Sequence, residues 1–183
     1  MLHMIRRVVA GLDSSGRSTI VSDGAPSDIF PSSAFPAHAV TLLWDAGTLP
    51  TTNDGETPPA KGKEFRLAEG GARLLLWEYP PLRDIPHEQR SAFLANPIGL
   101  PIDNRDHPGF HATQSLDWLI VLRGELTVIL EKTETILHPG ELFIDRGVVH
   151  AWENRGTVPT IAIVANLDAR PIANMAATLN IVE

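Results

Sequence analysis

Two histidines and one aspartate have the types and spacing to do chemistry together. His111 opens the segment His-Ala-Thr-Gln-Ser-Leu-Asp, which ends at Asp117, and His150 follows about forty residues later. Side chains two apart in a β-strand lie on one face, so His111, Thr113 and Asp117 share a side if that strand has no bulge. If both segments line the inside of one barrel, two imidazoles and a carboxylate converge on one small substrate or one ion.

This set of groups allows two kinds of chemistry. His111, Asp117 and His150 form a two-His, one-carboxylate set, which suits Fe(II), Mn(II), Ni(II) or Zn(II) with positions left open for substrate. Without a metal, a histidine of ordinary pKa (about 6.5) and an aspartate whose pKa is raised by burial could act as an acid/base pair. Asp117 lies between Leu116 and Trp118. An inward carboxylate there needs a partner, and we expect the two imidazoles to supply it.

Other residues are candidates for binding the substrate rather than transforming it. Aromatic side chains could line a pocket for a ring-bearing substrate, although ordinary core packing is the alternative. Arg146 could anchor a substrate carboxylate near the barrel mouth, or could simply belong to the turn that aims His150. The predicted substrate-binding residues are Thr113, Arg146, Trp152, Trp77 and Tyr79.

The remaining histidines and one glutamate are given ordinary roles. His107 and His138 stand beside Pro and Gly in turns and are expected to be solvated. Glu78 is a further candidate carboxylate, although its expected place is on the exposed face of a strand. His3, His38 and His87 carry no functional signal.

Short β-prone segments separated by turns must position these residues. They predict an all-β barrel or sandwich, with segments at residues 5–11, 17–22, 39–45, 73–79, 118–122, 125–130, 133–137, 141–144 and 160–166. Pro86 to Ala95 is the best helix candidate, with Pro86 in its first turn. Residues 23–36 and 47–63 are expected to be loops. Residues 96–109 form either a lid or a connector, and 171–183 either a short helix or a strand exchanged with a partner.

Two motifs resemble those of the cupin superfamily. The first reads His111, Thr113, Asp117 and Gly124, where cupins usually have His, His, Glu and Gly. The second runs from Gly140 to Asn154 around His150. Its loop is one residue short, and Arg146-Gly147 stands where Pro and Gly are usual.

The resemblance covers residues 65 to 168 and implies a cupin-type jelly-roll β-barrel with an N-terminal strand extension and one or two short helices. We expect one domain over residues 1–183, with N-terminal strands and loops at 1–64, the barrel core at 65–168 and a tail at 169–183. The expected function is that of a metal-dependent dioxygenase or decarboxylase acting on a small organic acid or an aromatic or polyketide-like ring. The alternatives are a metal-free isomerase, dehydratase or cyclase, and a non-catalytic module that binds a small ligand. Resembling proteins usually pair through their N-terminal strands, so a homodimer is expected.

Composition limits the other possibilities. A chain of 183 residues with 43% hydrophobic and 20% charged residues is ordinary for one globular domain. The net charge of −7 and the absence of clustered basic residues argue against a nucleic-acid partner. There are no cysteines, which excludes disulfides and thiolate chemistry. No apolar run reaches the length of a membrane span, and the expected location is the cytoplasm.

Overall fold

A computed structural model describes residues 2–32, 35, 37–53, 67–95 and 106–172. Its strands are β1 (Arg7–Leu12), β2 (Ser18–Gly24), β3 (Ile29–Pro31), β4 (Ala39–Thr48), β5 (Gly71–Tyr79), β6 (Ser115–Arg123), β7 (Leu126–Leu130), β8 (Glu134–Leu137), β9 (Leu142–Asp145), β10 (His150–Glu153) and β11 (Thr160–Asp168). Its helical segments are the 3-10 turns η1 (Leu82–Asp84) and η2 (His87–Gln89) and the α-helix α1 (Arg90–Ala95).

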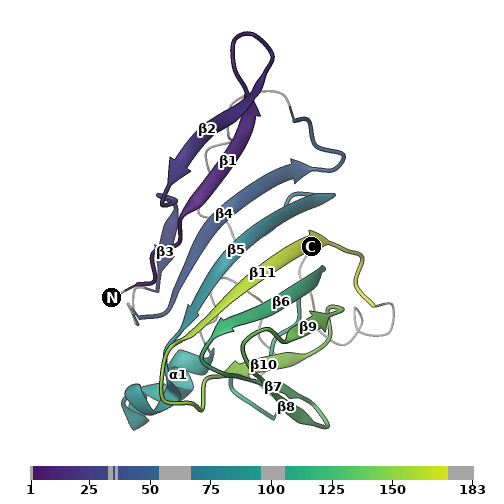
Figure 1. Ribbon diagram of the computed structural model, residues 1–183. Helices are drawn as coiled ribbons and strands as arrows, with labels where there is room; N and C mark the ends of the chain where they lie inside the picture. The colour runs from purple at the N-terminus through teal and green to yellow at the C-terminus, as the bar shows by residue number, and fades with distance from the viewer. Residues whose placement is uncertain (1, 33–34, 36, 54–66, 96–105, 173–183) are drawn as a thin grey trace.

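Two antiparallel sheets face one another and form the barrel. The larger sheet has the order β3-β4-β5-β11-β6-β9, and the smaller has the order β10-β7-β8 (Figure 1). Strands far apart in sequence become neighbours in this order, since β11 lies between β5 and β6. The predicted all-β jelly-roll architecture is confirmed. The short strand β3 falls in a segment expected to be loop.

The interior is filled by residues that alternate along the strands. Leu75 and Tyr79 of β5, Leu119 of β6, Val128 of β7 and Trp152 of β10 all belong to one buried hydrophobic cluster. On β6 the neighbouring positions point outward and are exposed. On β6 the period of two therefore separates the barrel interior from its outer face.

Helical turns close one end of the barrel. Pro86 precedes η2, which continues directly into α1. Phe93 and Leu94 of α1 are buried in the main cluster. The predicted helix from Pro86 to Ala95 is thus confirmed as a 3-10 turn followed by an α-helix. No helix in the described ranges is both long and apolar enough to traverse a bilayer.

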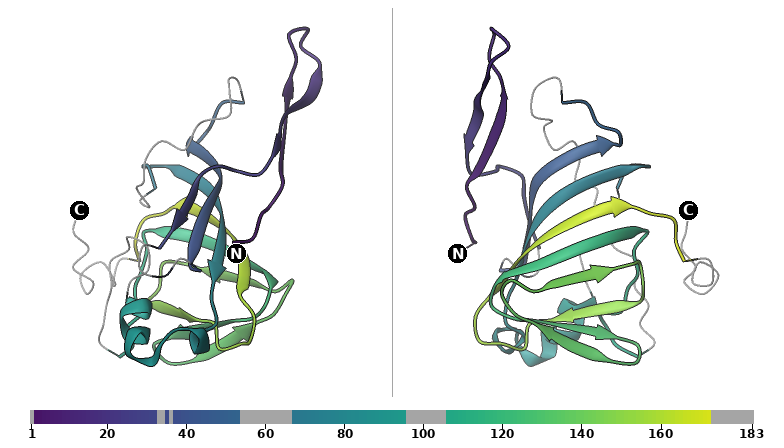
Figure 2. Two further views of the ribbon diagram at one scale, coloured as in Figure 1. Left: turned by 90° about the vertical axis from the view of Figure 1, so that its left-hand side faces the viewer. Right: turned by 45° about the vertical axis from the view of Figure 1, so that its right-hand side comes forward.

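The N-terminal hairpin stands apart from the barrel. β1 and β2 pair only with one another and project beyond the main body in both views of Figure 2. The segment before the hairpin lies against the outer face of the large sheet, where Ile5 packs with Leu43, Leu76 and Ile161. The backbone N–H of His3 donates to Glu78 Oε2 at 2.7 Å. Glu78 is buried, whereas the sequence analysis expected it to be exposed.

Asn154 ties three segments together at the end of β10. Its side chain is fully buried, and Nδ2 donates to the carbonyls of Tyr79 and Val158 at 3.0 and 2.8 Å. Its Oδ1 accepts the N–H of Gly156 at 2.9 Å, and its own carbonyl accepts the N–H of Leu82. Both side-chain polar atoms of this residue therefore serve the framework.

Candidate active site

The two histidines predicted from the sequence lie side by side, with their ring planes tilted by 56°. The ring centroids of His111 and His150 are 4.3 Å apart, and each residue is 2% exposed. The two residues form an isolated antiparallel bridge, in which each backbone N–H donates to the carbonyl of the other at 3.0 and 2.9 Å. The backbone pairing, and not the side chains alone, brings the rings together.

A carboxylate that the sequence analysis missed accompanies His150. Asp145, at the end of β9, is 1% exposed, and its Oδ2 lies 2.8 Å from Nδ1 of His150. The carbonyl of Val148 lies 2.8 Å from the same nitrogen. The hydrogen bond of Nδ1 goes to the Val148 carbonyl, and Oδ2 of Asp145 makes a close charge contact outside hydrogen-bond geometry. Alternation on β9 places Asp145 on the inner face with Phe143, and this was the signal that could have identified it.

Asp117 has other partners than those expected. Its Oδ1 accepts from Asn166 Nδ2 at 2.7 Å, and its Oδ2 lies 3.4 Å from Thr113 Oγ1. Thr113 in turn accepts from Ser115 Oγ at 2.9 Å. The expectation that the imidazoles satisfy this carboxylate is therefore not met. The position opposite Asp117 in the β6–β9 pairing is Asp145, so the two carboxylates lie on adjacent strands.

Burial and charge set the protonation of these groups. Burial, reinforced by the neighbouring His150, lowers the pKa of His111 to about 3, so this ring is neutral. Burial also opposes the charged form of His150, but the adjacent carboxylate of Asp145 outweighs it and raises the pKa of His150. The same pairing overcomes burial and lowers the pKa of Asp145. Burial raises the pKa of Asp117. The pair of rings therefore combines a neutral imidazole with one that binds a proton readily.

Aromatic side chains adjoin His150 inside the barrel. The ring of Trp152 lies 4.8 Å from that of His150, and Trp77 lies 5.8 Å from Trp152, both edge to face. Tyr79 is buried, and its hydroxyl donates to the carbonyl of Trp152 at 3.0 Å. Trp152 is thus the predicted aromatic residue closest to the histidines, while Tyr79 serves the framework.

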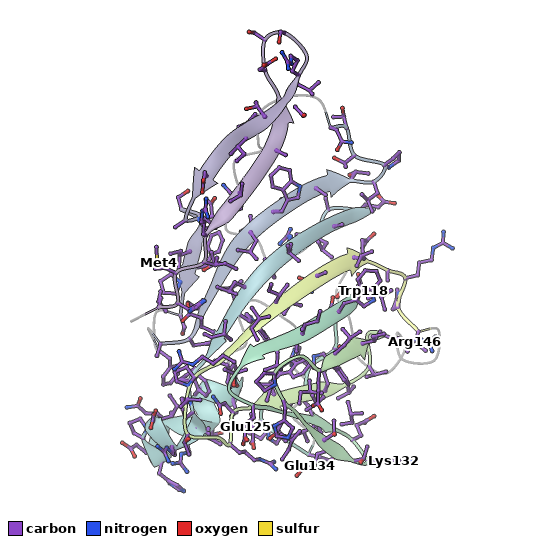
Figure 3. The ribbon with its side chains drawn as sticks, in the orientation of Figure 1. Met4, Trp118, Glu125, Lys132, Glu134 and Arg146 are labelled. Carbon is purple, nitrogen blue, oxygen red and sulfur yellow. The ribbon has the colours of Figure 1, made fainter. Side chains whose placement is uncertain are left out.

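Two further residues lie away from the rings. Arg146 is exposed, just beyond β9, and Figure 3 places it at the same end of the barrel as Trp118. Trp118 is 44% exposed on the outer face of β6, so it does not line the interior.

The donor set was compared with what a metal ion needs. Nδ1 of each ring faces a backbone carbonyl, Gly109 for His111 and Val148 for His150, which is common among metal-binding histidines. Across the described ranges, however, no three His, Cys, Asp or Glu side chains form a group that could hold a metal. In the described residues, Asp117 does not join His111 and His150 in the predicted three-ligand site.

Comparisons with known proteins agree with the motifs. The cupin domain family profile matches residues 103–166. The chain is 33% identical over 95 residues to phomopsin biosynthesis cluster protein C' of Diaporthe leptostromiformis, covering 45% of this chain and 50% of that protein. It is 36% identical over 66 residues to the cupin-domain-containing oxidoreductase virC of Hypocrea virens, covering 34% of each. The chain thus spans about half the length of the first relative and a third of the second.

Among solved structures, an uncharacterized conserved protein with a double-stranded β-helix domain from Klebsiella pneumoniae is 16% identical. The match covers 76% of this chain and 83% of the Klebsiella protein, with a TM-score of 0.42. The family match contains His111, Asp117 and His150, and it spans the strands from β6 to β10 with most of β11. Residues 103–166, which carry the two motifs within the jelly-roll barrel, thus match the cupin domain family.

Proposed function

We propose that this cupin is an enzyme that moves a proton on a small organic substrate, with His150 as the acid/base residue. One observation carries the proposal: a neutral imidazole and a carboxylate-paired imidazole lie 4.3 Å apart in a buried site. Asp145 holds the ring of His150 and stabilises its protonated form, as the carboxylate of a His–Asp pair does. His111, whose pKa is about 3, is a poor base, and we assign it the role of hydrogen-bond acceptor for the substrate.

The reaction class follows from these roles. His150 takes a proton from one atom of the substrate and returns it to another, so no oxidant or reductant is consumed. Isomerisation and tautomerisation require only this transfer, and dehydration or cyclisation adds a leaving group or a nucleophile within the substrate. Trp152 and Trp77 adjoin the site and favour a substrate with a planar ring, such as an aromatic or polyketide-like compound.

Deuterium exchange tests this proposal without knowledge of the product. The protein is incubated in D₂O, with chelator, against a panel of small ring-bearing ketones, phenols and acids, and mass spectrometry detects incorporated deuterium. We expect catalysed exchange on at least one compound, and a loss of at least about a hundredfold in His150→Gln. His87→Gln, on the exposed turn η2, is the matched control. Exchange that is unchanged in His150→Gln would falsify the assignment.

The second candidate is a metal-dependent dioxygenase or decarboxylase. The anchoring of both Nδ1 atoms on carbonyls favours it, and virC, the relative described above, is named an oxidoreductase. The described donor set lacks a third ligand, so we derive no step through a metal. Elemental analysis after exposure to Fe(II), Mn(II), Ni(II) or Zn(II) separates the two candidates. A full equivalent that is lost in both His111→Ala and His150→Ala supports the metal enzyme, and less than about a tenth of an equivalent excludes it.

We also propose that the protein is a homodimer. Val8, Leu12 and Ile20 are exposed on the projecting hairpin, and a two-stranded hairpin alone is barely stable in water. A second set of apolar residues is exposed on the outer face of paired strands β6 and β9, namely Trp118, Ile120, Leu142 and Ile144. A second copy carries both surfaces, so a two-fold arrangement covers each hairpin with the other copy's sheet.

A further inference from the structure

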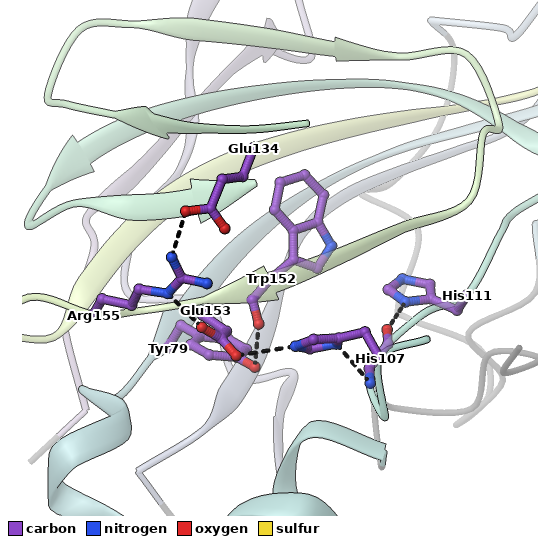
Figure 4. Close-up of polar contacts among 8 residues, drawn as sticks. Tyr79, His107, His111, Glu134, Trp152, Glu153 and Arg155 are labelled. Carbon is purple, nitrogen blue, oxygen red and sulfur yellow. Dashed lines mark hydrogen bonds and ion pairs between the residues drawn. The ribbon is translucent and has the colours of Figure 1, made fainter. Parts of the chain in front are cut away.

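A chain of polar contacts leads from the surface of the small sheet to His111. Its central carboxylate, Glu153 of β10, is 8% exposed. Oε1 of Glu153 lies 3.0 Å from Nε2 of His107. Arg155 binds the other oxygen of Glu153 through Nε and reaches Glu134 of β8 through Nη1 at 2.7 Å. Figure 4 shows these contacts together with the bond from His111 that ends the chain. His107, expected to be solvated, is instead half-buried and held at its ring nitrogens.

Hydrogen-bond direction fixes the tautomer of His107. The backbone N–H of Gly109 donates to Nδ1 of His107 at 3.0 Å, so Nδ1 is the acceptor nitrogen and carries no hydrogen. A carboxylate only accepts, so the contact with Glu153 requires the hydrogen of His107 to be on Nε2. The two contacts are compatible with one form of the ring.

The same reasoning then fixes His111. Its Nδ1 lies 2.9 Å from the carbonyl oxygen of Gly109, and a carbonyl only accepts. The hydrogen of neutral His111 is therefore on Nδ1, and the lone pair is on Nε2. That lone pair is what the proposed role of His111 as an acceptor requires.

The turn between His107 and His111 is closely packed. The N–H of Phe110 donates to the carbonyl of His107 at 3.0 Å, and the Phe110 ring lies 5.4 Å from that of His107. A Cβ added to Gly109 would lie 3.1 Å from the carbonyl oxygen of Leu94 and 3.2 Å from Nδ1 of His107. A displacement of the His107 ring is thus transmitted to the peptide groups of Gly109.

We propose that Glu153 and His107 are positioning residues, which act through Gly109 to hold His111 in its Nδ1–H tautomer with Nε2 available to the substrate. The inference rests on the proposed function for the use made of His111. The tautomer of His111 is independent of that function and can be measured without a substrate.

Long-range ¹H–¹⁵N NMR of protein labelled with ¹⁵N-histidine tests the proposal. The seven histidines are few enough to assign by single substitutions. In the native chain we expect His111 as one tautomer, with hydrogen on Nδ1. In His107→Phe and in Glu153→Ala we expect a mixture of tautomers and an exchange rate of the Nδ1 hydrogen about tenfold faster, because an ordering hydrogen bond is lost. His107→Asn, whose side-chain oxygen can replace Nδ1 as the acceptor for Gly109, should restore most of the native tautomer.

His150 provides an internal control, because Val148 and Asp145 hold it instead of Gly109. Its tautomer should be unchanged in all three variants. A His111 that keeps the pure Nδ1–H form in both His107→Phe and Glu153→Ala overturns the proposal, as does a loss of order at His111 and His150 together. A shifted tautomer in a protein that catalyses no deuterium exchange supports the positioning role while removing the proposed function.

Discussion

His111 and His150 pair through their backbones as well as their rings, since each accepts a hydrogen bond from the peptide N–H of the other. The 4.3 Å between ring centroids is therefore set by a β-bridge between two loops that are distant in sequence. A change that disturbs this bridge should therefore alter the distance between the two rings. Four predictions follow from the contacts around it and from the faces that surround the barrel.

Acid should destabilise the fold through buried histidines. Burial lowers the pKa of His38 to about 4, and neither of its ring nitrogens has a hydrogen-bond partner among the described residues. In the unfolded chain the value is about 6.5, so the unfolded state takes up the proton first. The stability is complete above pH 6.5 and is lost as the pH falls through 4, where His38 alone removes about 3 kcal/mol. Urea unfolding at a series of pH values measures this.

The matched variant for that experiment is His38→Phe. The ring of His38 packs edge to face on Tyr79 and Phe93, at 5.0 and 5.5 Å, so an aromatic replacement fits the surroundings. We expect a shallower loss between pH 6.5 and 4 than in the native chain, with His87→Phe unchanged. Parallel loss in His38→Phe and the native chain would assign the acid sensitivity to other groups, such as His111.

Asp145→Asn should lower the pKa of His150. The variant keeps the size of the side chain but removes the charge that offsets burial, so the pKa should fall below its ordinary value. Removing one partner of a buried pair should also cost about 3 kcal/mol of stability at neutral pH. NMR titration of the His150 ring and urea unfolding check both effects, with exposed Asp106→Asn as control. An unchanged titration of His150 would show that Val148, and not Asp145, governs its protonation.

Gly147→Ala should be much more harmful than Gly140→Ala. Both glycines have positive φ, +74° and +89°, so both variants bear a backbone cost of roughly 1 kcal/mol. A Cβ at Gly147 would also lie 2.8 Å from the carbonyl oxygen of Thr113, whereas nothing lies within 4 Å at Gly140. We expect about 2 kcal/mol more loss at Gly147, measured by urea unfolding. Equal losses would mean that the loop carrying Thr113 moves freely.

Trp118→Lys should separate the proposed homodimer. Trp118 and its cross-strand neighbour Ile144 are 44% and 51% exposed, and a charge there would have to be desolvated at the interface. Light scattering after gel filtration should show a dimer for the native chain and a monomer for the variant. Ile136→Lys, at a residue 46% exposed on the small sheet, is the control and should remain dimeric. A native monomer at micromolar concentration would contradict the proposal.

The sequence predicted the fold more completely than the site, for physical reasons. Short apolar and β-prone segments between turns were enough to place β5, β6, β7 and β11, and on β6 alternation also reports which face is buried. The partner of a buried polar group depends on which strands become neighbours, and alternation does not report this. Asp117 was recognised as inward, but its contact with Asn166 arises only because β11 lies beside β6.

The same limit explains the roles that were missed. His107 and Glu153 are separated by 46 residues and meet only in the folded barrel. His38 precedes β4 without any neighbouring motif, and its burial depends on rings from β5 and α1. Residues 96–105 and 173–183, which include most of the expected lid and tail, lie outside the described residues.

Asn154 shows what a family signature can and cannot report. This residue ends the second motif, yet its side-chain amide and its carbonyl are engaged by the main chain around it. A search guided by this asparagine will therefore collect proteins that share a scaffold, whatever reactions they perform. Sorting those proteins by chemistry requires comparing the positions of Asp145 and His107, where the surroundings of the two rings are decided.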